Sequence, residues 1–174
     1  ILAILTPLAL AGAVLFLVHN IIAKANLFLV SGVARRLAGS FLLGSIGGLY
    51  RSSPLLAFLF LVPALSLAGL PPLSGFWAKF LLIKASLDAA AYVIAATALL
   101  VGLLTLYSMT KIWAEAFWKP SPAGPPPALA QLEFRERAIL LLPVAALAGL
   151  TVTIGIFPEP FVAFAKHSAG QLLD

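Results

Sequence analysis

The sequence predicts an all-α protein, a polytopic transmembrane helix bundle of about five membrane segments, one of them discontinuous at a Pro-Gly break. Three observations support this prediction. The 174 residues are 62% hydrophobic and only 10% charged, with a mean hydropathy of +1.09, whereas soluble domains carry about 25% charged residues. Apolar runs of about 18 residues or more recur, each long enough to cross a bilayer. The motif LAGLPPLSG interrupts one such run.

Composition also narrows the function. The net charge of +5 and the pI of about 9.9 indicate loops facing anionic lipid or the positive-inside side of a membrane. The basic residues form no patch with stacking aromatic residues, so nucleic acid is not an expected partner. The sequence has no cysteine and only two histidines, and its carboxylates are not clustered. We therefore expect neither a metal site nor another cofactor.

The chain opens on Ile1, inside an apolar run and without an initiator methionine. We interpret residues 1–174 as a single transmembrane domain, the carboxyl-terminal part of a longer protein.

The first expected segment, 4–34, would form a helix roughly 45 Å long, so it is tilted or extends beyond the bilayer. Pro7 suits a helix amino terminus. Arg35 and Arg36 are expected to end the segment at a membrane surface. A loop rich in glycine and serine follows.

The second segment, 54–70, is expected to begin with Ser53 as N-cap before a proline. Pro71 and Pro72 then remove two amide donors and disfavour helix in the preceding residues. The third segment, 74–87, restarts after this break, near Gly75, and is short for a full crossing of about 30 Å.

Two layouts are compatible with this break. If it separates two crossings, the basic residues before it lie opposite those after it. If it interrupts one crossing, six basic residues share a side, which obeys the positive-inside rule better: Arg35, Arg36, Arg51, Lys119, Arg135 and Arg137.

The fourth segment, 91–117, ends in aromatic residues typical of a membrane interface. A loop containing SPAGPPP leads to a mixed-charge stretch and the fifth segment, 138–157. Pro158 and Pro160 end this segment, and we interpret the tail FVAFAKHSAGQLLD as a short amphipathic piece.

Polar residues inside the first segment are the leading functional candidates, because charges at membrane depth are costly and mark ion pathways. Asn20, Lys24 and Ser31 fall near one helical face, and His19 and Asn26 form a second row beside it. We expect these rows to face protein or water. A desolvated lysine can lose its proton near neutral pH, and a histidine can pass one on. Helix-to-helix hydrogen bonding is the structural alternative.

Lys79 follows the helix break, where freed carbonyls and half-helix ends can bind ions in transporters. Lys84 lies about 140° further round the same helix, so the two lysines need not share a face. For Lys84 we favour snorkelling to an interface. Lys111 and Glu115 have the i,i+4 spacing of an ion pair, which we place at the membrane interface.

The stretches HNIIAKANLFLVSG, LAGLPPLSGFWAKFLLIKASL and GLLTLYSMTKIWAEAFW carry a resemblance. They resemble the antiporter-like membrane subunits shared by Mrp-type multisubunit sodium/proton antiporters and respiratory complex I, and the pattern is most similar to the D type of Mrp subunits, down to GIFPEP. The resemblance implies two inverted repeats with discontinuous helices and a midplane row of buried ionisable residues. It matches Lys79 to the lysine of the second discontinuous helix, and Lys24 with His19 to the polar link leading to it.

The resemblance implies a cation/proton antiporter subunit in a prokaryotic cell membrane, with other membrane subunits, protons and Na⁺ as partners. One alternative is the homologous proton-pumping subunit of complex I or of a membrane-bound hydrogenase, which genomic neighbours would separate. A structural membrane scaffold is the other alternative. The proton pathway is predicted through Lys24, His19 and Lys79, with Asn20, Lys84, Lys111 and Glu115 as secondary candidates.

Overall fold

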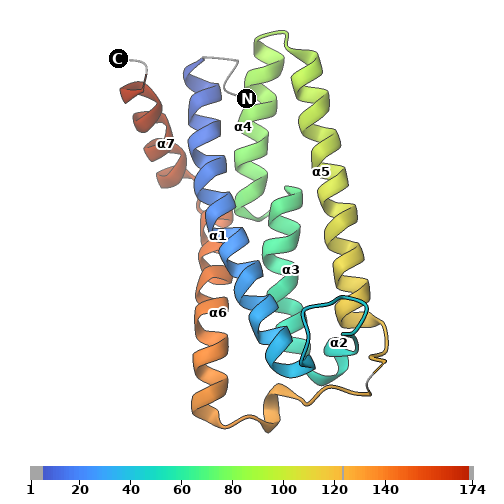
Figure 1. The fold of residues 1–174 in the computed structure, drawn as a ribbon. Helices are drawn as coiled ribbons and strands as arrows, with labels where there is room; N and C mark the ends of the chain where they lie inside the picture. Colours follow the sequence, from blue (N-terminus) through green and yellow to red (C-terminus); the bar gives the residue numbers. More distant parts are fainter. Residues whose placement is uncertain (1–5, 123, 173–174) are drawn as a thin grey trace.

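The structure, a computed structural model, describes residues 6–122 and 124–172 and is all-α in these ranges (Figure 1). The helices are α1 (Pro7–Ala38), α2 (Leu49–Ser52), α3 (Pro54–Ala68), α4 (Ser74–Asp88), α5 (Tyr92–Trp113), the π-helical turn η1 (Ala114–Trp118), the 3-10 turn η2 (Leu129–Gln131), α6 (Phe134–Ile156) and α7 (Glu159–Gln171). α1 runs through the bundle and packs against α3, α4, α6 and α7. The predicted fold class is therefore confirmed in its helical character.

In the described part of the chain, three helical stretches are long and apolar enough to cross a membrane: Pro7–Ala38, Tyr92–Trp118 and Phe134–Ile156. α3 and α4, with 15 residues each, are too short to cross alone. They follow one another end to end along the bundle, α3 in its lower half and α4 above it (Figure 1). Of the five predicted segments, the first, fourth and fifth thus correspond to long apolar helices, and the second and third to the two short helices on either side of the break.

The boundaries of α1 follow from its local sequence. The Thr6 hydroxyl accepts a hydrogen bond from the Ala9 amide at 3.2 Å, and Pro7 occupies the first turn, as expected for a helix start. The helix continues four residues beyond the predicted end at 34, because Arg35 and Arg36 lie in its last turn, where positive charge complements the carbonyl end. Gly39, at φ 76°, ends it. The predicted start at residue 4 lies outside the described residues.

The later boundaries differ by a few residues from those predicted. Ser53 precedes α3, but its hydroxyl accepts from the Leu129 amide at 3.2 Å instead of capping the helix. α6 begins at Phe134, not 138, because the mixed-charge stretch forms its first turn. The amphipathic tail forms α7, which packs along α1.

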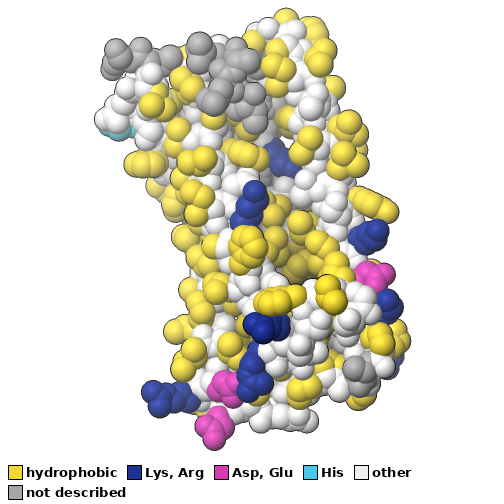
Figure 2. Space-filling model, in the orientation of Figure 1, with side chains coloured by type: hydrophobic (Ala, Val, Ile, Leu, Met, Phe, Trp, Pro, Cys, Tyr) yellow, Lys and Arg dark blue, Asp and Glu magenta, His cyan; other side chains and the backbone are white. Residues whose placement is uncertain are grey.

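The basic residues on both sides of the break gather at one end of the bundle. Arg36 at the end of α1 pairs with Glu136 at the start of α6, with Nη2 and Oε1 2.8 Å apart. The Gly48 amide, before α2, donates to the Lys119 carbonyl at 2.6 Å. Figure 2 shows most of the charged side chains on the visible face in its lower part, while hydrophobic side chains cover much of the remainder. This arrangement agrees with the layout in which all six basic residues share a side.

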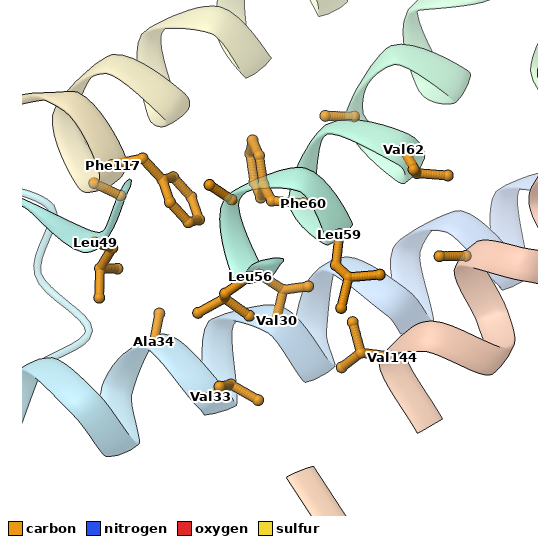
Figure 3. Close-up of a cluster of buried hydrophobic side chains, with 14 of the residues drawn as sticks. Val30, Val33, Ala34, Leu49, Leu56, Leu59, Phe60, Val62, Phe117 and Val144 are labelled. Carbon is orange, nitrogen blue, oxygen red and sulfur yellow. The ribbon is translucent and has the colours of Figure 1, made fainter. Parts of the chain in front are cut away.

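The main apolar core lies where α1, α3, η1 and α6 meet (Figure 3). Phe60 of α3 contacts Phe117 of η1 with ring centroids 5.1 Å apart, a favourable separation for an aromatic pair. Leu59 of α3 lies in the same core, near Val30 of α1 and Val144 of α6. A second cluster joins α1, α4 and α7. These two clusters hold α3 and α4 against α1 on either side of the helix break.

Candidate functional site

The helix break forms the centre of the candidate site. α3 ends at Ala68, and Gly69, at φ 93°, turns the chain back so that its amide donates to the Leu65 and Ser66 carbonyls. Positive φ is readily accessible to glycine, which lacks a Cβ. The break leaves the Ala68 carbonyl at the negative end of the α3 dipole. A cation placed there is stabilised.

Lys79 supplies that cation. Its half-buried side chain extends from α4, and Nζ donates to the Ala68 carbonyl oxygen at 2.9 Å. The predicted association of Lys79 with a helix break is therefore present in the structure, and its role in proton movement stays a prediction. The contact is made across the break, from one half-helix to the end of the other.

A glycine of α5 leaves room for this contact. A Cβ at Gly102 would lie 3.3 Å from Lys79 Nζ and 3.4 Å from the Ala68 oxygen. Beside the amine is a cavity of about 450 Å³, lined mainly by apolar side chains of α4 and α5 such as Phe76, Phe80 and Leu103. Sequence reasoning missed Gly102, and an isolated glycine in an apolar helix is not a sufficient signal, because Gly149 of α6 is also isolated and has open space around a built Cβ.

Filling this space is expected to disturb Lys79. In a Gly102→Val variant of the complete subunit, the branched side chain would displace Nζ from the Ala68 oxygen. Hydrogen bonds to charged groups contribute about 1.5–3 kcal/mol, so we expect cation/proton antiport in vesicles to fall at least about tenfold. Gly149→Val is the matched control, because Gly149 also lies within a helix but has no atom within 4 Å of a built Cβ. Equal antiport in both variants would contradict the expectation.

His19 of α1 also lies at the break, inside a polar cluster. Its side chain is 1% exposed, and Nδ1 is 2.9 Å from Ser74 Oγ and 3.4 Å from Ser66 Oγ. Ser66 Oγ is also 3.2 Å from Ser74 Oγ and accepts from the Gly75 amide at 3.1 Å. The cluster joins α1, the end of α3 and the start of α4. Sequence reasoning did not single out Ser66, although a serine just before a helix break in an apolar run is the signal that could have identified it.

The two polar rows predicted on α1 have different environments. Asn26, in the row of His19, is fully buried, and with its amide oriented to suit α6 it donates to the Val144 carbonyl at 3.3 Å and accepts from the Ala148 amide at 3.2 Å. Asn20 is partly exposed, and Lys24 and Ser31 are exposed in this chain. The structure thus brings His19, but not Lys24, into the cluster at the break.

Two of the secondary candidates form surface ion pairs. Lys84 Nζ lies 2.9 Å from Asp88 Oδ2 on an exposed face of α4, so it does not join the cluster at the break. Glu115 pairs with Lys119 at 3.0 Å, and the predicted pair of Lys111 with Glu115 is wrong. A glutamate that precedes its lysine by four residues has the better orientation along a helix, and Lys119 provides that arrangement. Exposed pairs of this kind contribute little stability.

In residues 6–122 and 124–172, no three His, Cys, Asp or Glu side chains are grouped so that they could hold a metal ion.

Comparison with known proteins places this arrangement in a family. The family model described as NADH:quinone oxidoreductase/Mrp antiporter, TM, matches residues 1–105. The D-type subunit of the Na(+)/H(+) antiporter of Alkalihalophilus pseudofirmus is 45% identical over 173 residues, covering 99% of this chain and 34% of that protein. The N-type subunit of the F(420)H(2) dehydrogenase of Methanosarcina mazei is 31% identical over 180 residues, covering 98% of this chain and 35% of that protein.

Two solved structures are similar to this chain in fold and in sequence. A chain of the Mrp complex from Dietzia matches with a TM-score of 0.87 and 31% identity, over 99% of this chain and 39% of that one. A chain of respiratory complex I from Thermus thermophilus matches with a TM-score of 0.75 and 29% identity, over 96% and 35%. This chain spans about a third of the length of the curated relatives. It belongs to the NADH:quinone oxidoreductase/Mrp antiporter transmembrane family.

Proposed function

We propose that this chain is part of the membrane subunit of a multisubunit Na⁺/proton antiporter, in a prokaryotic cell membrane. The observation that carries the proposal is the Lys79 amine, 2.9 Å from the Ala68 carbonyl at an interrupted helix. Similarity to the D-type subunits of Na(+)/H(+) antiporters over nearly the whole chain supports the choice of antiport. Other membrane subunits of the complex would be its partners.

In this proposal Lys79 alternates between its charged and neutral forms. The charged form is attracted to the carbonyl end of α3, and its charge repels protons on neighbouring groups. Loss of the charge removes both effects. A lysine suits this role because it can release its proton when desolvated, whereas arginine does not.

His19 and Lys24 complete the proposed pathway. His19 lies at the break, and its imidazole has hydrogen-bond partners at Nδ1 through which a proton could be exchanged. Lys24 lies five residues further along α1 on an exposed face of this chain. We propose that this face meets protein or water in the complete subunit, because a lysine facing lipid at membrane depth is costly. Asn20 lies between the two residues along α1.

A proton-pumping role in a quinone reductase is the second candidate. It is supported by the similarity to a chain of respiratory complex I and to the N-type subunit of the F(420)H(2) dehydrogenase. The membrane chemistry at Lys79 would be shared by both functions. The two functions differ in the process that drives proton movement, which is exchange for Na⁺ in the antiporter and electron transfer to a quinone in the reductase.

The test uses everted vesicles from antiporter-deficient cells that carry the complete set of neighbouring genes. With a pH gradient imposed, addition of sodium is expected to dissipate it, and removal of the gene for this protein is expected to abolish the response. A gradient that sodium leaves unchanged, but that a reduced electron donor generates, would instead support the quinone reductase role. No response to either would contradict both functions and favour a scaffold.

A further inference from the structure

The cluster at the helix break is a directed chain of hydrogen bonds that begins at a backbone amide. His19, Ser66 and Ser74 are each at most 1% exposed. The Gly75 N–H lies 3.1 Å from Ser66 Oγ, Ser66 Oγ lies 3.2 Å from Ser74 Oγ, and Ser74 Oγ lies 2.9 Å from His19 Nδ1. Buried polar groups of this kind are costly unless each has a partner.

The amide at one end and the number of available acceptors together set the favoured direction of the chain. A backbone N–H can only donate, so Ser66 Oγ accepts from Gly75. The nearer acceptor for the Ser66 hydroxyl proton is Ser74 Oγ, and the Ser74 hydroxyl proton then has His19 Nδ1 as its acceptor. Both hydroxyl protons are satisfied in this direction. In the reverse direction His19 donates to Ser74 and Ser74 to Ser66, and the Ser66 proton has no acceptor among the described contacts.

We infer that Ser66 and Ser74 are positioning residues that hold neutral His19 with its proton on Nε2 and with Nδ1 as the acceptor. A neutral imidazole carries one N–H, so an accepting Nδ1 places the proton on the other nitrogen. The inference rests on the proposed function, because it assigns to the His19 of that pathway the atom at which a further proton is received.

This assignment leaves one buried group unpaired, the Nε2–H, whereas the reverse direction leaves two, the Ser66 hydroxyl proton and the Nε2 lone pair. Nε2 is buried and has no hydrogen-bond partner among the described residues. It faces Gly75, where a built Cβ would lie 2.7 Å away. No described group competes for this proton, so the hydroxyl chain at Nδ1 decides the tautomer.

The test compares serine variants in the complete assembly, with antiport in everted vesicles as the readout. Ser66→Ala and Ser74→Ala are expected to lower antiport roughly threefold to tenfold, the effect of losing one hydrogen bond. Ser66→Thr and Ser74→Thr, which keep the hydroxyl, are expected to restore at least half of the lost rate. Ser86→Ala is the matched control, because Ser86 is also buried on α4 but donates only to its own helix, at the Leu82 carbonyl, 2.8 Å away.

A double variant separates positioning from simple packing. If the serines act through His19, Ser74→Ala added to His19→Gln should lower antiport no further than His19→Gln alone. Two outcomes would overturn the inference and leave the proposed function intact. In the first, antiport in the double variant falls by the product of the losses in the two single variants. In the second, the serine variants retain as much antiport as Ser86→Ala, while His19→Gln is inactive. Normal antiport in His19→Gln would overturn both the pathway through His19 and the inference.

Discussion

Antiport is expected to be lost when Lys79 is replaced by alanine in the complete assembly. The alanine side chain cannot alternate charge at the Ala68 carbonyl, and this alternation is what would move neighbouring protons in the proposed pathway. Lys79→Arg is expected to fail as well, because arginine remains charged at working pH. The measurement is dissipation of a pH gradient on sodium addition in everted vesicles, with protein levels checked by blotting.

Lys84→Ala provides the control on the same helix. Lys84 forms an exposed ion pair with Asp88, which contributes about 0–1 kcal/mol, so antiport should stay close to the unmodified level. Near-normal antiport in Lys79→Ala vesicles would refute a proton-carrying role for Lys79. An equal loss in Lys84→Ala would show that the assay reports a general effect of removing positive charge from α4.

The helix break could be predicted from the sequence because its causes are local. Pro71 and Pro72 lack amide donors wherever they are placed, and Gly69 supplies a positive φ without help from neighbours. The same holds for the start of α1, where Thr6 and Pro7 act within one turn. Such features need no knowledge of the packing.

Which polar row of α1 would be buried could not be predicted, because it depends on where α3, α4 and α6 pack. The helical period separates the row of His19 and Asn26 from the row of Lys24 and Ser31, but both rows are polar. Only the packed structure shows that Ser66 and Ser74 meet His19, and that α6 meets Asn26. Gly102 is likewise explained by a contact with Lys79 across two helices.

The partner of Glu115 illustrates a further kind of failure. Lys111 and Lys119 are both four residues away, so spacing alone allows either pair. The structure selects Lys119, at 3.0 Å. The orientation rule for helical ion pairs would have favoured Lys119 over Lys111, so part of this error could have been avoided from the sequence.

The second large effect is expected at Gly75, where α4 begins against the end of α3. A Cβ built on Gly75 would overlap the carbonyl oxygen of Ser66 and lie 2.7 Å from His19 Nε2. The first obstacle is backbone at a helix end and cannot rotate away. In Gly75→Ala, α4 must therefore move from α3, which would pull Ser74 off His19 and weaken the packing around the break.

The measurement is the melting temperature of the detergent-solubilised assembly, together with the amount of the protein in the membrane. Forcing one methyl group into a packed interior costs about 1–3 kcal/mol, and we expect Gly75→Ala to lie at or above that range because backbone is the obstacle. Gly149→Ala is the matched control. Gly149 has open space around a built Cβ, so alanine there should be neutral or stabilise the helix by about 0.4–1 kcal/mol. If the Gly75→Ala assembly has the same melting temperature as the unmodified assembly, α3 and α4 are not held in contact at Ser66.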